Sequence, residues 1–553
     1  MQLFHSLLPL RNPLGFGAAD YTELAVALFL LILYLVRARI TPFARRIAGR
    51  TALSMLLIAG LAIALRLALL PNFPVPTPTG SDDFSHLLVA DTLLHFRLAN
   101  PPHPLSQFFE AIYVLQQPTY SSMYPLGHGV VLAAGRLIFG TPWAGTLLSA
   151  SAFCALCYWM LRAWTTPVWA LVGGILAVIQ FGPLSQWMNA YWITTLPAVS
   201  GALVFGALPR LRQSLHWRHA SILGLGLAIH IVTRPFESIL LGASVLLYFA
   251  FFPWRTESRR ILRTTCVAIL VMLPAFGLTL LQNKAVTGNW ITLPYMVSRY
   301  QYGIPATFAF EPNPTPHRPL TPEQDLDYRA QCAIHGDQPE TLRSYFERLL
   351  YRARYYRFYF LPALYLAVLA FLLTVRSRDY LWVLAAIAIF VLASNLYPYF
   401  YPHYIGAVTC LFILAAVTGL SKLARWNLAW PLLAVCLAHF AFWYGIRLTG
   451  NPEIFPALAY ESWDFVNRGD PEGRIAIDTQ LAAAPGEQLV FVRYAPNHGF
   501  HEWVHNEADI DRARVVWALD LGEEENRKLI QYFPNRKVWI VQPDLAPPRL
   551  SPY

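Results

Sequence analysis

Long apolar segments separated by short polar ones recur along most of the 553-residue chain. Many of these segments approach the roughly 20 apolar residues that a helix needs to cross a bilayer. We predict twelve membrane-spanning helices, at residues 21–36, 51–71, 144–162, 167–181, 193–208, 220–233, 237–253, 264–281, 358–374, 380–395, 404–421 and 428–446. The pattern therefore predicts an α-helical polytopic membrane protein.

Arginines gather in alternate connections between the apolar segments. Residues 37–50 carry five of them, residues 209–219 carry three and residues 254–263 carry four. Because basic connections stay on the cytoplasmic side of a membrane, we expect the loops 72–143 and 282–357 on the outer side.

One apolar segment, YPLGHGVVLAAGRLIFG at residues 124–140, must not cross the membrane if this alternation is to hold. It contains Arg136 and several glycines, so we predict a helix that lies at the outer interface or dips into the membrane. Both termini are then outside. We divide the chain into a transmembrane domain, 1–447, and a soluble outer domain, 448–553.

The composition changes in the outer domain. The segments QLVFVRY, ARVVWALD and KVWIVQPD, at 488–494, 513–520 and 537–544, have the pattern of buried strands, and residues 522–533 have helical spacing. This order predicts a small α/β domain. Residues 494–509 are rich in His and acids but lack tight metal-ligand spacing, so we favour a solvated connection over a metal site there.

Composition agrees with a membrane protein. Charged residues make up 13% of the chain, whereas about 25% is usual for a soluble domain. The formal net charge of +10 comes from arginines at predicted helix ends, so we expect no nucleic-acid partner. Cys154 and Cys157 lie within an apolar segment, where packing is the expected role, and we predict no disulfide. The first 20 residues lack the pattern of a removable signal peptide.

Two adjacent acids, Asp82 and Asp83, open the first outer loop within PTPTGSDDFSHLLVADTLLH. They begin a helical pattern, so one interpretation is that they cap a helix and stabilise it by about 0.3–1 kcal/mol. The alternative is a chemical role, as a general base or an acidic site at the membrane surface. The local sequence leaves both interpretations open.

Arginines supply the candidates for binding an anion. Arg234 and Glu237 stand at an outer corner between two short helices, where the arginine is either ion-paired and snorkelling or a clamp for a phosphate. Arg66 is an unusual charge within an apolar segment. The arginines of residues 343–357 fit an amphipathic helix on anionic lipid, which is the interpretation that we favour.

Aromatic and polar residues of the outer loops are candidates for binding a substrate. The segment after the two acids is too apolar and aromatic for a disordered linker, so we predict a folded platform. The later segment NLYPYFYPHYIGAV, at 395–408, adds tyrosines that mostly fit an interfacial belt. The candidates are His103, Glu110, Tyr120, Tyr124, His128, His403 and Tyr404.

The order of these features resembles the GT-C superfamily of glycosyltransferases, which are membrane enzymes that use sugars linked to polyprenyl phosphate. The resemblance is carried by SDDFSHLLVADTLLHFRLANP at 81–101 and PTYSSMYPLGHGVVLAAGRLIFGTPWAG at 118–145. Related groups include protein O-mannosyltransferases, the aminoarabinose transferase of lipid A and rhizobial lipopolysaccharide galacturonosyltransferases. A bacterial subgroup also shares the RPFE corner, 234–237, and the LVFVRYAPNH segment.

The resemblance implies a reaction on the outer side of a bacterial inner membrane. A sugar would pass from a polyprenyl-phosphate donor to an extracytoplasmic lipid, glycan or protein, with the active site and residues 448–553 on the periplasmic side. No cofactor is implied beyond this donor substrate. The second outer loop, 182–192, contains no acid, which favours a metal-independent reaction over a divalent metal held between two loops.

The resemblance also implies roles for single residues. The first acid of the outer loop is the family's catalytic base, which corresponds to Asp82 here. Asp83 follows where Glu is frequent, so which acid points into the site stays open. We assign the donor phosphate to Arg234 first and to Arg66 second, with an arginine of residues 343–357 third, and we predict inversion at the anomeric carbon.

Two other functions fit parts of the pattern. A transporter or flippase for lipid-linked sugars would place polar residues deep in several helices, whereas polarity here concentrates at one face. An O-antigen-type ligase or polymerase would also have large outer loops, and the sequence separates it poorly from a glycosyltransferase.

Overall fold

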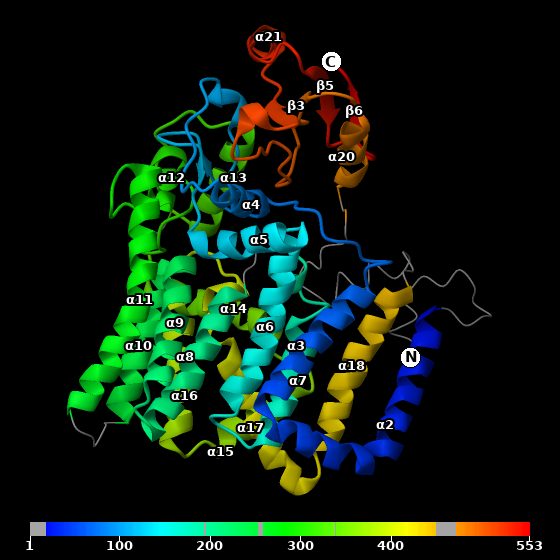
Figure 1. The fold of residues 1–553 in the computed structure, drawn as a ribbon, viewed down its shortest axis with the longest axis vertical. Coiled ribbons are helices and arrows are strands. Elements are labelled where there is room, and N and C mark those ends of the chain that lie inside the picture. The colour runs from blue at the N-terminus through cyan, green and yellow to red at the C-terminus, as the bar shows by residue number, and fades with distance from the viewer. Residues whose placement is uncertain (1–17, 193–194, 253–257, 338, 450–469, 471) are drawn as a thin grey trace.

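The computed structural model describes residues 18–192, 195–252, 258–337, 339–449, 470 and 472–553. A bundle of helices forms one end of the molecule, and a small sheet domain stands on the other end (Figure 1). Parts of three predicted segments, 193–208, 237–253 and 254–263, lie outside the described residues, and so do residues 450–469.

Each of the twelve predicted apolar segments coincides with a helix of the bundle. These helices are α2 (Ala18–Gly49), α3 (Thr51–Ala68), α6 (Trp143–Leu161), α7 (Pro167–Phe181), α8 (Leu196–Gln213), α9 (Trp217–Thr233), α10 (Pro235–Phe251), α11 (Ser258–Thr287), α15 (Leu364–Thr374), α16 (Arg378–Ser394), α17 (Thr409–Leu423) and α18 (Ala429–Thr449). Their continuous apolar sequences favour helices whose backbone polar groups are satisfied within the segment, as a bilayer requires.

Among the described residues, five helices are both long and apolar enough to cross a membrane. They are Thr51–Ala68, Trp143–Leu161, Ser258–Thr287, Pro402–Trp426 and Ala429–Leu448. A sixth crossing is available if Leu342–Tyr359 and Leu364–Thr374, which meet at a bend of 114°, form one broken span. The structure thus supports a multi-pass helical protein, and the total of twelve crossings stays a prediction.

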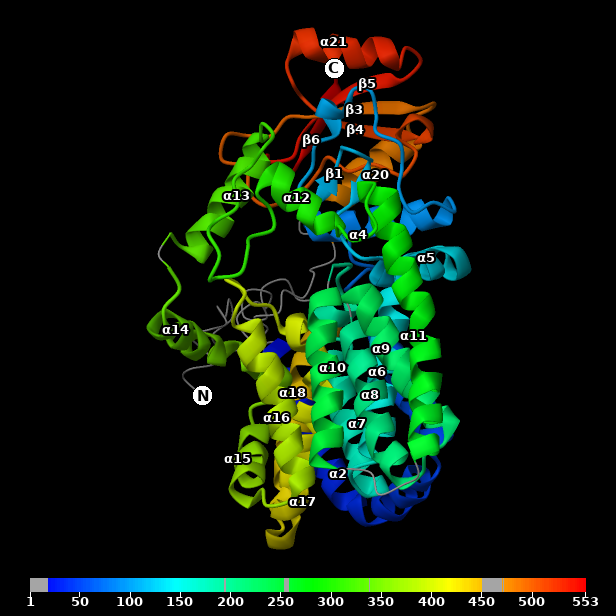
Figure 2. The ribbon, with the colours of Figure 1, turned by 90° about the vertical axis from the view of Figure 1, so that its left-hand side faces the viewer.

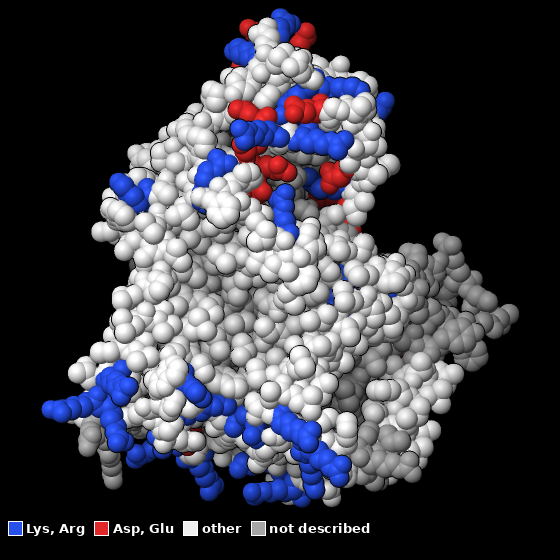
Figure 3. Space-filling model, viewed as in Figure 1, with Lys and Arg blue, Asp and Glu red and all other residues white. Residues whose placement is uncertain are grey.

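The surface of the bundle has a basic end and an apolar middle. Figure 3 shows Lys and Arg gathered at the end of the bundle opposite the sheet domain. A band that is almost free of charge separates this basic end from the sheet domain. Large apolar side chains such as Leu56, Leu246 and Leu270 are exposed on the outward faces of their helices. Such an apolar surface is expected where lipid, rather than water, surrounds a protein.

The predicted outer loop 72–143, called the first outer segment from here on, folds against one end of the bundle. It contains α4 (Ser81–Leu94), η1 (Ser106–Phe109), the antiparallel strands β1 (Val114–Leu115) and β2 (Ser121–Ser122), and α5 (Leu126–Phe139). Helix α5 lies across the end of the bundle instead of running along it (Figure 1). This arrangement agrees with the predicted interfacial helix at 124–140.

A second outer segment connects α11 with α15. It contains α12 (Pro294–Tyr302), α13 (Pro322–His335), α14 (Leu342–Arg352) and η3 (Ala353–Tyr359). Figure 2 shows α12 and α13 between the helical bundle and the sheet domain. The two outer segments therefore meet at the same end of the molecule.

The C-terminal domain is α/β, as predicted. Its sheet has the order β4-β3-β5-β6, formed by β3 (Gln488–Val492), β4 (Val515–Leu519), β5 (Lys537–Gln542) and β6 (Arg549–Pro552). Strands β4 and β5 both run parallel to β3, and β6 runs antiparallel to β5. Helices α20 (Arg474–Ala483) and α21 (Glu523–Tyr532) complete the domain.

The C-terminal domain is fixed to the first outer segment by buried polar contacts. The backbone N–H of Ile112 donates to Glu502 over 3.4 Å, and the N–H of Ala508 donates to Asp91 over 2.6 Å. The ring of His505 stacks on Phe84 at a centroid distance of 3.9 Å. Because Phe84 belongs to α4, the domain packs directly on the helix that carries the acidic pair.

Small residues bring the elements around the outer end into close contact. A Cβ at Gly127 of α5 would lie 2.5 Å from Oγ1 of Thr233, at the end of α9. A Cβ at Gly201 of α8 would lie 1.7 Å from the carbonyl oxygen of Ala407, in the η4 turn (Pro402–Val408). Both positions therefore require glycine, and both allow close contact between neighbouring elements at this end of the bundle.

Candidate functional site

A cavity of about 530 Å³ opens where the outer segments meet the end of the bundle. Its walls come from α4, from residues 112–128, from the α9–α10 corner, from α12 and α13, and from residues 397–404. Phe500 of the C-terminal domain also lines it. The cavity has the size and the mixed apolar and polar lining of a small-molecule site.

The two adjacent acids point to different places. Asp83 accepts hydrogen bonds from the backbone N–H groups of Thr79, Gly80 and Tyr191, at 3.1, 3.4 and 2.7 Å. It therefore caps the start of α4 and ties it to the loop before α8. Asp82 lines the cavity and accepts a hydrogen bond from the hydroxyl of Tyr124.

Burial changes the acidity of Asp82. Loss of hydration raises the pKa of its carboxyl from the ordinary value to about 7, and the neighbouring Asp83 and Asp327 add to the rise, against the hydrogen bond from Tyr124. A carboxyl group that ionises near neutrality is suited to accept a proton from a substrate hydroxyl.

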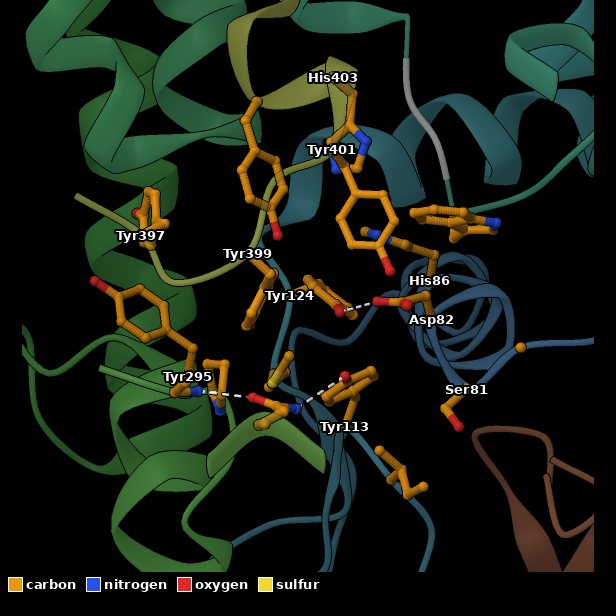
Figure 4. Close-up of a pocket in the computed structure, with 18 of the residues that line it drawn as sticks. Ser81, Asp82, His86, Tyr113, Tyr124, Tyr295, Tyr397, Tyr399, Tyr401 and His403 are labelled. Atoms are coloured by element: carbon orange, nitrogen blue, oxygen red, sulfur yellow. Dashed lines mark hydrogen bonds between the residues drawn. The ribbon is translucent and has the colours of Figure 1, made fainter. Parts of the chain in front are cut away.

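Tyrosines surround the space in front of Asp82. Figure 4 shows Tyr113, Tyr124, Tyr399 and Tyr401 around one opening, with the carboxyl group of Asp82 pointing toward Tyr124. Two come from the first outer segment and two from the segment before η4. Their rings and hydroxyl groups offer both stacking surfaces and hydrogen bonds to a polar ligand.

Two arginines line the cavity with different partners. The guanidinium of Arg234 donates to one oxygen of Glu237 from Nε over 3.0 Å and from Nη2 over 2.5 Å, and it lies over the ring of Tyr404. Among the described residues, the hydrogen bonds of Arg299 go to the backbone carbonyls of Pro305 and Ala306, over 3.1 and 3.0 Å. Within the described residues, no carboxylate lies at ion-pair distance from Arg299, so its positive charge is not neutralised.

A further acid, Asp327 of α13, lines the same cavity. Its Oδ2 accepts a hydrogen bond from Nε2 of Gln331 over 2.7 Å, and Tyr113 also hydrogen-bonds to it. Burial raises the pKa of Asp327 to about 6, against these hydrogen bonds.

Four predicted binding residues lie together in the cavity, and the histidines among them are buried. His128 shares a hydrogen bond with the backbone oxygen of Tyr191, and His403 packs its ring on those of Trp192 and Tyr401. The four are Tyr124, His128, His403 and Tyr404.

Three other predicted binding residues join outer elements to each other, away from the cavity. Nε2 of His103 lies 3.1 Å from Oδ1 of Asp511 in the C-terminal domain, and the hydroxyl of Tyr120 donates to the carbonyl of Asn506 over 3.1 Å. Glu110 accepts hydrogen bonds from Tyr302, Arg318 and Gln324 of the second outer segment. These side chains build the scaffold around the cavity.

The second and third candidates for the phosphate also lie elsewhere. Arg66 is buried and donates to Asn189 over 2.6 Å and to the carbonyls of Phe73 and Pro74. It thus joins the end of α3 to two outer connections. The arginines of residues 343–357 are not among the lining residues, and Arg348 pairs with Glu340 over 2.7 Å.

Sequence reasoning missed several residues of the cavity. Arg299 and Asp327 occur in a long loop with no motif around them, and Tyr113 stands alone between two apolar residues. Tyr399 and Tyr401 lie in a segment whose tyrosines also fit an interfacial belt. The only available signal was that both outer loops are long and fall on the same side.

Among the described residues, no group of three or more His, Cys, Asp or Glu side chains could hold a metal ion. The His-rich residues 494–509 are used in local contacts. His498 lies 2.7 Å from Asp544, and His501 lies 2.8 Å from Glu472.

The chain was compared with known proteins. No family model matches it, and no curated protein matches it. Among solved structures, ArnT from Cupriavidus metallidurans in the apo state is similar, with 14% identity over 88% of this chain and 92% of that chain and a TM-score of 0.49. The same protein bound to undecaprenyl phosphate gives 13% identity, the same coverages and a TM-score of 0.48.

An oligosaccharyltransferase from Archaeoglobus fulgidus, in a complex with Zn and sulfate, is also similar. Its identity is 12% over 88% of this chain and 67% of that chain, with a TM-score of 0.45. These structural neighbours are members of the GT-C superfamily, which the sequence resembles. At such low identities and scores, nothing about the reaction of this chain follows from them.

Proposed function

We propose that this protein is a membrane glycosyltransferase that transfers a sugar from a polyprenyl-phosphate donor to an acceptor on the outer side of a bacterial inner membrane. The observation that carries the proposal is that an acid with a pKa near 7, Asp82, and two arginines, Arg234 and Arg299, line one cavity. The residues that line the cavity come mainly from the two outer segments and from the ends of α9 and α10 that face them.

The position of the cavity suits a donor with a lipid tail. Its walls include the outer ends of α9 and α10, whose outward faces are apolar. A polyprenyl chain can therefore stay in the bilayer while its phosphate and sugar enter the cavity. The basic end of the bundle lies opposite and faces the cytoplasm in this proposal (Figure 3).

The reaction requires a base and a site for negative charge. The acceptor oxygen attacks the anomeric carbon while the bond from that carbon to the phosphate oxygen breaks, and the configuration inverts. Asp82 takes the proton from the acceptor hydroxyl. The leaving group is a polyprenyl phosphate that gains a negative charge, which an arginine stabilises.

Arg299 is better placed than Arg234 to stabilise the negative charge of the leaving phosphate by itself. Because Arg234 is held by two hydrogen bonds to Glu237, its charge is largely neutralised. Arg299 is positioned by two carbonyls, and no carboxylate of the described residues forms an ion pair with it. We assign the phosphate to Arg299 together with Arg234, and not to Arg66, which does not line the cavity.

The experiment compares Asp82→Asn with the wild type in detergent. Release of undecaprenyl phosphate from undecaprenyl-phosphate sugars is measured in the presence of a cell-envelope extract as the source of acceptor. We expect a loss of about 10²–10⁴-fold, because the amide cannot accept the proton. Binding of undecaprenyl phosphate itself, followed by native mass spectrometry, should not change.

Asp325→Asn is the matched control. Asp325 is a half-buried acid that pairs with Arg329 and does not line the cavity, so its loss should leave release unchanged. Full release by the Asp82→Asn protein would show that another group is the base. Failure of the wild type to bind undecaprenyl phosphate would contradict the proposed donor class.

A further inference from the structure

Asp327 is a buried acid that the proposed reaction does not use. It lies on α13, where Glu323 and Asp325 are only partly buried, and its own buried side chain lines the cavity. Within the described residues, no Lys, Arg or His lies at ion-pair distance from it. A buried carboxylate without a cation is costly, so its hydrogen-bond partners and its ligand decide whether it is tolerated.

The carboxyl group of Asp327 is held in place by an anchored amide. Gln331, one helical turn further along α13, donates to Asp327 from Nε2 over 2.7 Å. The Oε1 of the same amide accepts from the backbone N–H of Ala306 over 2.8 Å, and its Nε2 also lies 3.3 Å from the hydroxyl of Tyr113. A carboxylate fixed by such second contacts is preorganised for binding.

Asp327 and Asp82 act on the same side chains of the cavity. Tyr113 and Tyr399 both lie in the electrostatic field of the two acids, and so does Tyr401. The two acids come from different outer segments, and both line the cavity together with Tyr113, Tyr399 and Tyr401. Carboxylates accept hydrogen bonds from hydroxyl groups, and aromatic rings pack against the C–H faces of a sugar.

We propose that Asp327 binds hydroxyl groups of the donor sugar and thereby selects which lipid-linked sugars the cavity accepts. The inference rests on the proposed function, because it requires a sugar in the cavity. Asp82 then lies at the reacting carbon, and Asp327 holds the sugar ring in front of it. Asp327 is a substrate-binding residue, distinct from the base.

The test measures how much the sugar adds to lipid binding. Wild type and Asp327→Asn are titrated in detergent with undecaprenyl phosphate and with a set of undecaprenyl-phosphate monosaccharides, and the Kd values are measured by native mass spectrometry. We expect at least one sugar-bearing lipid to bind roughly tenfold more weakly to the variant, since a charged hydrogen bond is lost. The Kd for undecaprenyl phosphate should stay the same.

Two further variants separate this effect from a fault in folding. Asp325→Asn alters an acid two residues away on α13 that does not line the cavity, and it should change neither Kd. Gln331→Ala keeps the carboxylate of Asp327 but removes the amide that holds it in place. This variant should therefore weaken sugar binding by a smaller factor than Asp327→Asn. The thermal unfolding temperature of each variant is recorded alongside.

The outcomes distinguish the inference from the proposed function. If the wild type binds undecaprenyl phosphate and Asp327→Asn leaves the ratio of the two Kd values unchanged for every sugar, the inference is wrong and the proposed function stands. The inference also fails if no sugar changes the affinity of the wild type. If the wild type binds none of the lipids, both fail.

Discussion

Asp82 and Asp83 are neighbours in the chain, but successive helical residues point about 100° apart, so α4 gives them different surroundings. Asp83 turns back to the backbone N–H groups before the helix and to Tyr191. Asp82 turns into the cavity. Asp83 therefore has the role of the helix cap, and Asp82 is left as the candidate for the general base.

The raised pKa of Asp82 predicts a pH dependence. A general base acts only as the carboxylate, so kcat/KM for transfer should fall tenfold per pH unit below about pH 7 and level off above it. If the base had an ordinary carboxyl pKa, kcat/KM would stay at its high-pH value down to about pH 4. The measurement is kcat/KM for release of undecaprenyl phosphate over this range.

Asp82→Asn provides the control for this profile. Any residual release by the variant should lose the dependence near pH 7, because the titrating group is gone. A profile that keeps the same midpoint in the variant would assign it to another group, with Asp327, whose pKa is about 6, as the first alternative.

At the residue scale, sequence reasoning named Asp82 and Arg234, which line the cavity, but not Asp327 and Arg299, which line it as well. Asp82 and Arg234 carry local signals, an acidic pair and a charged corner. Asp327 and Arg299 carry no local signal, because they reach the cavity only through the way in which a long loop folds back. Glu110 and His103, predicted to bind a ligand, do not line the cavity and contact other outer elements, since polar side chains in an aromatic loop can serve as scaffold equally well.

Helix α8 and the η4 turn illustrate how elements position the site. Gly201 lets the backbone at Ala407 approach α8, and the same turn carries His403 and Tyr404 into the cavity. Because the Cβ of any other residue would lie 1.7 Å from the carbonyl of Ala407, the turn would have to move.

Gly201→Val should therefore reduce both stability and ligand binding. Overpacking of this contact costs about 1–3 kcal/mol or more, and displacement of η4 should weaken binding of undecaprenyl-phosphate sugars. The unfolding temperature in detergent and the lipid Kd are the measurements. Gly242→Ala, in α10 with nothing within 4 Å of the added Cβ, is the control and should not lower stability.

Unchanged stability in the Gly201→Val protein would contradict the close contact between α8 and η4.

At the scale of elements, the sequence predicted the helices well, because apolar segments of this length have few alternatives to a helix in a membrane. It did not predict the bend of 114° before Leu364, since the apolar pattern continues through the break at residues 360–363.

The charge distribution of the whole molecule predicts its orientation. Single cysteines placed at Glu523 in α21 and at Ser377, between α15 and α16, lie at opposite ends of the structure (Figure 2). With Cys266 and Cys332 replaced by serine, a membrane-impermeant maleimide should label position 523 in cells with a permeable outer membrane. Position 377 should be labelled only after lysis, and the reverse pattern would contradict the proposed orientation.

The C-terminal domain is coupled to the outer segments through Glu502. Its carboxyl group is buried and accepts hydrogen bonds from Ile112, Tyr494 and Val504. Burial raises its pKa to about 7, against these hydrogen bonds. The docked state therefore keeps a proton on Glu502 that the solvated carboxyl of an undocked domain would release.

This difference fixes the direction of a pH effect on docking. The docked state binds more protons between the ordinary pKa of Glu and about pH 7, so docking is strongest below this window and weakens as the pH rises through it, by up to about 3 kcal/mol. Hydrogen–deuterium exchange in residues 112–115, corrected for intrinsic rates, should increase accordingly. Glu502→Gln cannot ionise and should remove the dependence, whereas an equal pH effect in this variant would place the titrating group elsewhere. Because Phe500 of the same segment lines the cavity, weaker docking should also lower affinity for the sugar-bearing lipid.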